Sequence, residues 1–384
     1  MLTTDIKFKN FKKLKNKKKT KKIFISLLKE KNFILKSLSK NYKNNFEIQK
    51  IKSYKKSVNF RVIGIGGSIL GTRSIYDFLR DKIKKKFLFF DNLHSYNKKN
   101  NKKKFTNLII SKSGNTIETI VNANLIIKKN DKNIFITENK KNYLNDFAKK
   151  LKAEIIHHNN FIGGRYSVLS EVGMLPAELM GLNSRKFKQF NSLIKNKKFV
   201  NSLLLNVEKI YHFIQNRKFN SIIINYDEKS ESLFKWYQQL VAESLGKKNI
   251  GLLPIISNMP KDNHSVMQLY LDGFKNNFFT FFYVKDFKTE KINNSIILES
   301  HKYLKNKKLK DIIFLQKKAS ENVFDKKNIP YRSFEINKRD EKTLGELFCF
   351  FILETILLGK LLNLNPYDQP AVELIKNETN KLLI

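Results

Sequence analysis

The chain has 384 residues, a length that suggests about two domains, and its 41% hydrophobic content excludes a chain that is disordered throughout. The 75 lysines and arginines exceed the 34 acidic residues by a formal net charge of +41. Such a charge is typical of nucleic-acid-binding proteins, but it also follows from a genome biased toward lysine and asparagine codons. Because the basic residues are scattered and no nucleic-acid-binding motif is visible, we expect no nucleic-acid partner.

Neither a membrane span nor a secretory signal is predicted. The most apolar run, Leu344–Leu362, is interrupted by three charged residues and predicts a buried helix, in which Glu354 would form a structural ion pair. The basic N-terminus lacks the apolar stretch of a secretory signal. The single cysteine, Cys349, has no partner for an intramolecular disulfide, which fits a reducing compartment. We therefore expect a soluble, cytoplasmic protein that does not associate with membranes.

The chain divides into four parts along the sequence. Residues 1–55 are rich in lysine and carry apolar residues at helical spacing, which predicts a basic, helical N-terminal segment. Short apolar strands then alternate with helices over residues 56–190, the first domain, and again over residues 191–366, the second domain. Residues 367–384 predict a C-terminal helix that carries active-site residues.

The individual elements are expected as follows. In the first domain the strands are Phe60–Ile65, Phe87–Phe90, Leu108–Ile110, Ile134–Ile136 and Glu154–Ile156, and the helices are Ile69–Arg80, Thr116–Lys128, Tyr143–Lys150 and Gly173–Leu182. After a polar linker at Asn183–Lys198, the second domain has the strands Ser221–Tyr226, Leu252–Ile256, Phe278–Val284 and Tyr331–Ile336, and the helices Ser202–Gln215, Glu231–Leu245, Ile292–Leu304 and Lys342–Leu361; the last helix is Val372–Leu382. Continuous apolar strands separated by helices indicate parallel sheets that are buried on both faces. The fold class is therefore α/β, with two three-layer α/β/α sandwich domains whose sheets are mainly parallel.

The first glycine-rich motif, GIGGSILG at Gly64–Gly71, follows a predicted strand and opens a helix. Glycines there let the backbone approach an anion, and the helix N-terminus favours negative charge. The motif lacks the third glycine of a dinucleotide-binding motif and the Lys-Ser/Thr pair of a P-loop. It indicates contacts from Gly67 and Ser68 to a phosphate or to substrate hydroxyls, with a tight strand–helix turn as the alternative.

A second motif, SKSGNTIET at Ser111–Thr119, also follows a strand and opens a helix. A helix cap needs a single polar residue, whereas this motif carries four hydroxyl groups and a lysine. Hydroxyl groups at a helix N-terminus suit a phosphate monoester that is bound without a metal ion. The predicted phosphate-binding residues are Ser111, Lys112, Ser113, Thr116 and Thr119.

Three further motifs complete a series: GGRYSVLS at Gly163–Ser170, ESLGK at Glu243–Lys247 and DQPAVELIK at Asp368–Lys376. The five motifs resemble those of the glucose-6-phosphate isomerase family, in the family's order and over most of the chain. The resemblance implies two sugar-isomerase-type (SIS) domains, no cofactor and no metal. It also implies an enzyme of glycolysis and gluconeogenesis that interconverts glucose 6-phosphate and fructose 6-phosphate. Such an enzyme opens the sugar ring and moves a proton between C1 and C2 through a cis-enediol(ate).

The resemblance also implies a role for each matching residue. Glu243 would be the base that moves the proton, and Arg165 would stabilise the negative enediolate with a charge that cannot lose its own proton. His264, in NHSVMQ, would protonate the ring oxygen and would come from the partner subunit of a homodimer. Lys376 would be the second group that acts in ring opening.

Other matching positions would contact the substrate. The resemblance implies such contacts for Gly164, Gln239 and Gln369, and Gln239 lies one helical turn before Glu243 on the same face. Trp236 lies about two helical turns before Glu243, and we expect its side chain to lie in the core. Ala371 and Ile375 stand where the family often has glycine, and neither change removes a reactive group.

Two other functions remain open at this point. A dual isomerase would also accept mannose 6-phosphate, since the choice between epimers depends on the shape of the pocket at C2. A sugar-phosphate-binding regulator would keep the phosphate site without catalysis. The presence of Glu243, Arg165, His264 and Lys376 in one chain favours the enzyme.

Overall fold

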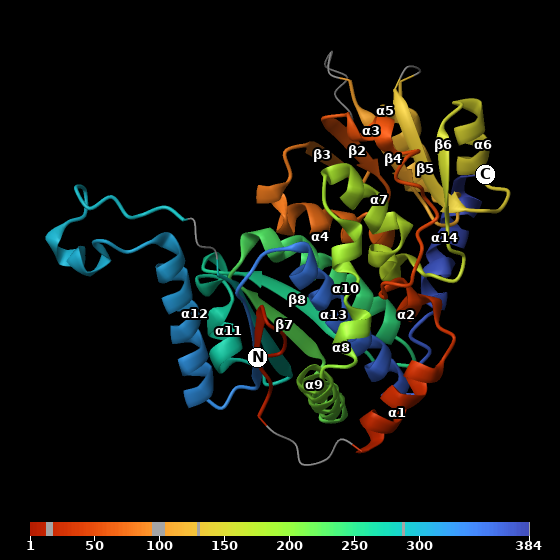
Figure 1. The fold of residues 1–384 in the computed structure, drawn as a ribbon. Coiled ribbons are helices and arrows are strands. Elements are labelled where there is room, and N and C mark those ends of the chain that lie inside the picture. Colours follow the sequence, from red (N-terminus) through yellow and green to blue (C-terminus); the bar gives the residue numbers. More distant parts are fainter. Residues whose placement is uncertain (13–17, 94–103, 129–130, 286–288, 384) are drawn as a thin grey trace.

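The structure, a computed structural model, describes residues 1–12, 18–93, 104–128, 131–285 and 289–383. Its strands form two five-stranded sheets, with the orders β3-β2-β4-β5-β6 and β1-β10-β9-β7-β8 (Figure 1). Between them lies helix α10 (Glu231–Leu245), which packs against strand β8 of the second sheet and against helix α4 of the first. The predicted α/β class with mainly parallel sheets is confirmed.

The first sheet is parallel throughout. Its strands are β2 (Asn59–Ile63), β3 (Lys86–Phe90), β4 (Thr106–Ile110), β5 (Lys132–Glu138) and β6 (Glu154–His158), and its helices are α4 (Leu70–Phe78), α5 (Ile117–Ile126), α6 (Tyr143–Lys150) and α7 (Glu171–Met180). Every residue of β4 is buried, as expected for a strand that helices cover on both faces. Each strand predicted for this domain is present, with ends that differ by at most a few residues.

The second sheet has four parallel strands and one antiparallel edge strand. Its strands are β1 (Ile6–Lys9), β7 (Asn220–Asn225), β8 (Leu253–Asn258), β9 (Asn277–Val284) and β10 (Tyr331–Ile336), and its helices are α9 (Lys197–Gln215), α10, α11 (Met267–Asp272), α12 (Leu309–Lys326) and α13 (Glu341–Leu361). The predicted buried helix at Leu344–Leu362 is therefore α13. No helix in the described part of the chain is both long and apolar enough to span a membrane.

The ion pair predicted for Glu354 is present in the core around α13. Glu354 pairs with Arg332 of β10, and both side chains are almost fully buried. Asn206 and Tyr237 each donate a hydrogen bond to the same carboxylate. Cys349 and Trp236 are also buried, in agreement with the predicted core positions.

The N-terminal segment was expected to be helical, and it contains a strand as well as helices. Its helices are α1 (Lys18–Lys29), α2 (Phe33–Ser37) and α3 (Lys52–Lys55). Strand β1 pairs Ile6 with Ile336 at the edge of the second sheet. The four-residue pattern Ile-Lys-Phe-Lys is too short to distinguish a strand from the lysine-rich sequence around it.

Two other expectations were wrong. The predicted helix Ile292–Leu304 is an exposed arm with only a short 3₁₀ turn at Glu299–Leu304, and the helix follows later as α12. The apolar residues of the arm have no core to face, since Ile296 and Leu298 are 76% and 75% exposed. The predicted linker Asn183–Lys198 is packed, because Phe187, Phe190 and Leu193 are buried in it.

Candidate active site

The site is built where three motifs meet at the carboxyl ends of strands. The 3₁₀ turn η1 (Gly66–Ser68) follows β2, the 3₁₀ turn η3 (Gly164–Leu169) follows β6, and both contact α10. A Cβ atom at position 67 would lie 2.5 Å from the backbone nitrogen of Arg165. Glycine at position 67 therefore lets the two turns touch. Gly66 has a φ of +53°, and a Cβ there would lie 2.8 Å from Nε2 of Gln239.

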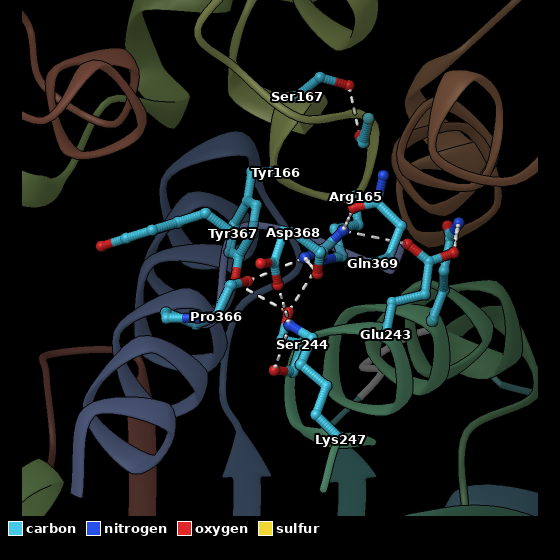
Figure 2. Close-up of polar contacts among 12 residues, drawn as sticks. Arg165, Tyr166, Ser167, Glu243, Ser244, Lys247, Pro366, Tyr367, Asp368 and Gln369 are labelled. Atoms are coloured by element: carbon cyan, nitrogen blue, oxygen red, sulfur yellow. Dashed lines mark hydrogen bonds and ion pairs between the residues drawn. The ribbon is translucent and has the colours of Figure 1, made fainter. Parts of the chain in front are cut away.

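Arg165 lies at the centre of this contact and is only 2% exposed. All five N–H donors of its guanidinium are used, and Figure 2 shows their partners converging on it. Nε donates to Ser244 Oγ at 2.8 Å, Nη1 to Glu243 Oε2 at 3.2 Å and Gln369 Oε1 at 2.6 Å, and Nη2 to the carbonyls of Pro366 at 2.8 Å and Asp368 at 3.0 Å. The guanidinium is thus held in one orientation by helix α10 and by the loop before the C-terminal helix.

Glu243 lies on α10 with its carboxylate partly open to solvent. Its side chain is 27% exposed, in contrast to that of Arg165. One oxygen accepts the hydrogen bond from Arg165, and the other accepts one from Gln239 Nε2 at 2.7 Å. Oε1 of Gln239 is buried and has no hydrogen-bond partner among the described residues. Both carboxylate oxygens are therefore oriented, and an unused acceptor lies beside them.

The loop before the C-terminal helix closes the back of the site. Lys247 of the ESLGK motif pairs with Asp368 at 2.8 Å, and this contact lowers the pKa of the Asp368 carboxyl. The hydroxyl of Tyr166 donates a hydrogen bond to the carbonyl oxygen of Pro366 at 2.8 Å. Burial raises the pKa of Tyr166, so the hydroxyl keeps this proton. No role was predicted for these residues or for Ser244, although each lies in or next to one of the five motifs.

The predicted phosphate-binding residues lie next to η1. Strands β2 and β4 are neighbours, and a Cβ at Gly64 would lie 2.8 Å from the carbonyl oxygen of Ile110 and 3.2 Å from Cβ of Ser68. The loop after β4 therefore starts beside Ser68. Its hydroxyls face one another, since Ser111 Oγ and Thr116 Oγ1 are 2.8 Å apart.

Three residues of the SKSGNTIET motif differ in the hydrogen bonds and ion pairs that their side chains form. The hydroxyl of Thr119 is buried and has no hydrogen-bond partner among the described residues. Lys112 pairs with Glu138 at 3.3 Å. Ser113 is exposed, and its hydroxyl accepts a hydrogen bond from the backbone of Asn115. Thr119 is thus the member whose side chain most clearly lacks a partner.

Two predicted catalytic residues lie away from Arg165 and Glu243. His264 ends a short 3₁₀ turn after β8, and its side chain is exposed. Lys376 lies on α14 (Pro370–Leu383), where it pairs with Glu373 at 2.6 Å. In the described part of the chain, neither side chain forms a hydrogen bond or an ion pair with Arg165, Glu243 or Gln369. The single chain therefore brings Glu243, Arg165, Gln239 and Gln369 into contact, but it does not bring His264 or Lys376 into contact with them.

A cavity of about 890 Å³ opens beside the carboxylate. Its walls come from α4 and α10 and include Gln239 and Glu243. Basic and acidic side chains alternate around it, with Arg73 paired to Asp91 at 2.9 Å. A sugar phosphate fits a space of this size, which is typical of small-molecule sites. Among the described residues, no group of three or more His, Cys, Asp or Glu side chains is placed to hold a metal ion.

Comparisons with known proteins identify similar sequences. A sequence model described as "Phosphoglucose isomerase" matches residues 29–253. A glucose-6-phosphate isomerase of Methanocaldococcus jannaschii is 34% identical over 349 residues, which cover 85% of this chain and 84% of the relative. A glucose-6-phosphate isomerase of Campylobacter jejuni is 33% identical over 83% of each chain.

Solved structures show the same fold. A hypothetical protein from Thermus thermophilus superposes with a TM-score of 0.84 at 21% identity, covering 96% of this chain and 94% of that one. A glucose-6-phosphate isomerase from Chlamydia trachomatis superposes with a TM-score of 0.71 at 18% identity, covering 88% and 72%. From the family match and from relatives above 30% identity along most of its length, we conclude that this chain belongs to the phosphoglucose isomerase family.

Proposed function

We propose that the protein is an aldose–ketose isomerase that interconverts glucose 6-phosphate and fructose 6-phosphate. The observation that carries the proposal is the pairing of a buried, fully hydrogen-bonded Arg165 with a partly exposed, oriented Glu243. Relatives that carry the name of this activity match 85% and 83% of this chain. A site that only bound a sugar phosphate would need neither the base nor the fixed cation beside it.

The phosphate group of the substrate would bind at the loop after β4. Ser111, Thr116 and Thr119 would donate hydroxyl hydrogen bonds, and the unpartnered hydroxyl of Thr119 supports this assignment. Lys112 would add positive charge. The backbone of Gly67 and Ser68 would contact the sugar from the adjacent turn.

Glu243 would then take the proton from one carbon and return it to its neighbour. The enediolate that forms in between carries negative charge, which Arg165 would stabilise without changing its position, because its guanidinium is already held on every side. Gln239 would keep the carboxylate aimed at the substrate, and Gln369 and Gly164 would line the opposite wall. Preorganised charge of this kind lowers the barrier because no dipole must turn during the reaction.

Ring opening would require groups that a single chain keeps apart. We propose a homodimer in which His264 of one subunit protonates the ring oxygen in the site of the other. The exposure of His264 and its separation from Glu243 support this arrangement. Helix α14 supports it as well, because none of its described residues is buried and its apolar residues Leu374 and Ile375 are 70% and 73% exposed. A partner that covers α14 would also fix the position of Lys376.

The test follows glucose 6-phosphate formation from fructose 6-phosphate by purified protein. We expect turnover by the wild type and a loss of about 10³-fold or more in Glu243→Gln, which keeps the shape but removes the base. Glu299→Gln, at a 74% exposed carboxylate that does not line the cavity, is the matched control and should keep nearly full activity. A folded wild-type protein that binds fructose 6-phosphate without turnover would instead identify a regulator. Comparing turnover of mannose 6-phosphate separates the dual isomerase.

A further inference from the structure

A second cavity, of about 930 Å³, shares no lining residue with the cavity beside Glu243. Three stretches of chain surround it, within residues 40–48, 183–189 and 340–342, and we call it the basic cavity. Its volume lies in the range that small organic ligands occupy. The proposed isomerase reaction does not use it.

The charge of the basic cavity is strongly one-sided. Six cationic side chains line it: Lys40, Lys43, Arg185, Lys186, Lys188 and Lys342. The one carboxylate in the lining, Asp340, is already engaged, because it caps α13 through the backbone of Thr343 and pairs with Lys338 at 3.0 Å. It therefore neutralises little of the charge that faces the cavity.

The composition of the chain does not by itself explain this imbalance. In the cavity beside Glu243, basic and acidic residues are both present, and Arg73 and Lys229 each form an ion pair. In the basic cavity, by contrast, Lys40, Lys43, Arg185 and Lys186 form no ion pair with any described residue. Like charges gathered around one space repel one another, and a bound anion would relieve that repulsion.

Lys188, one of the six cationic residues, forms the floor of the basic cavity. Lys188 is 3% exposed, and its ammonium donates to the carbonyls of Ser37 and Leu169. In its charged form, which a bound anion favours, the ammonium has three donors, so one remains for a ligand. The ring of Tyr42 lies 4.8 Å from the same ammonium.

We propose that the basic cavity binds a diphosphate group. Apart from Lys342, the cationic side chains come from two separate stretches of chain, the loop after α2 and residues 185–188. Each set would bind one of the two adjacent phosphates. Arginine suits this role because its planar fork binds phosphate oxygens in pairs. On one wall Phe46 and Ile48 offer apolar surface, which an organic group attached to the diphosphate would contact.

The test is calorimetric titration of the full-length protein with inorganic pyrophosphate, near physiological salt and with saturating fructose 6-phosphate to occupy the active site. We expect one binding site per chain. The double variant Arg185→Ser/Lys186→Ser should weaken binding by about tenfold or more, since it removes two charge-assisted contacts. The control Lys21→Ser/Lys22→Ser makes the same charge change on exposed positions of α1 and should alter affinity less than about twofold.

Two further titrations distinguish the source of the diphosphate. Adenosine diphosphate that binds more tightly than pyrophosphate would indicate an organic ligand that uses the apolar wall, and equal or weaker binding would indicate the inorganic ion; both support the site. Equal losses in the cavity variant and the control would show attraction by bulk charge only and would overturn the proposal. Binding of single-stranded RNA without binding of either diphosphate would overturn it too.

Discussion

Arg165 and Glu243 lie 78 positions apart in the sequence and share one hydrogen bond, from Nη1 to Oε2 at 3.2 Å. The two residues differ in exposure: the guanidinium is almost completely buried, while about a quarter of the carboxylate side chain is open. The positive charge of Arg165 is thus fixed inside the protein, and the carboxylate of Glu243 is partly open to solvent. This arrangement leaves the carboxylate free to exchange a proton while the positive charge stays in place.

Replacement of Arg165 by lysine should therefore reduce kcat by about 10²-fold or more, although the charge is kept. Lysine has three donors at a single point and cannot reach Ser244, Glu243 and the loop at Pro366 together. Steady-state kinetics with fructose 6-phosphate would measure the loss. Arg217→Lys, at an exposed position outside the site, should behave like the wild type. Activity within twofold of the wild type in Arg165→Lys would contradict the role assigned to the guanidinium.

Gly67→Ala should be far more damaging than Gly163→Ala. The added methyl group at position 67 would meet the backbone of Gly164 and Arg165, which cannot move aside without opening the site. At position 163 the nearest atom would be Tyr166 Cδ2 at 3.8 Å, an ordinary contact. We expect a loss of about 3 kcal/mol or more in the free energy of unfolding for Gly67→Ala and of less than about 1 kcal/mol for Gly163→Ala. Denaturant titration would measure both, and similar values would show that the two turns do not touch.

The proposed exchange of His264 between subunits predicts recovery of activity from two inactive variants. Glu243→Gln and His264→Ala proteins are each expected to be nearly inactive. When they are unfolded together and refolded, half of the dimers should be mixed, and each mixed dimer has one site with both native residues. The mixture should regain about one quarter of the wild-type activity. No recovery, with mixed dimers demonstrated by differential tags, would place His264 in the site of its own chain.

Lys188 gives a prediction about pH. Burial lowers its pKa from 10.5 to about 7, against the smaller opposing effects of Glu171 and Cys349. Between pH 7 and pH 10.5, Lys188 is protonated in the unfolded chain and neutral in the folded protein. The free energy of unfolding should therefore rise with pH in this range. The contribution of this group approaches about 1.4 kcal/mol per pH unit.

Lys188→Met removes that contribution. The difference in unfolding free energy between wild type and variant should therefore increase from pH 7 to 9.5 in favour of the wild type, as measured by denaturant titration. Lys195→Met, at an exposed lysine, is the control and should run parallel to the wild type. Parallel curves for Lys188→Met would show that this lysine remains charged in the folded protein.

The alternating part of the fold was predictable because each buried strand is a continuous apolar run. The predicted bounds of strand Tyr331–Ile336 and helix Glu231–Leu245 are the same as those of β10 and α10 in the structure. The arm at Ile292–Leu304 was not, because its apolar residues have helical spacing but no surface to pack against. Strand β1 was missed because its pairing with β10 depends on a contact across nearly the whole chain.

For the site, the motifs identified the residues, while the contacts among them required the structure. Gln239 could be placed beside Glu243 from helical spacing alone. The convergence of Ser244, Pro366 and Asp368 on Arg165 could not, since it depends on how a loop near the C-terminus folds back onto α10. The positions of His264 and Lys376 in an assembled enzyme stay predictions.

The pairing of β1 with β10 also bears on how the chain folds during synthesis. Thr3 donates a hydrogen bond to Glu346, 343 positions later, so the segment around β1 must wait for a distant part of the chain before it can pair. The first sheet can form while the second is still being made, since domains fold as units from the N-terminal side. Until β10 emerges, β1 has no strand to pair with, which delays completion of the second sheet until the chain through β10 has been synthesised.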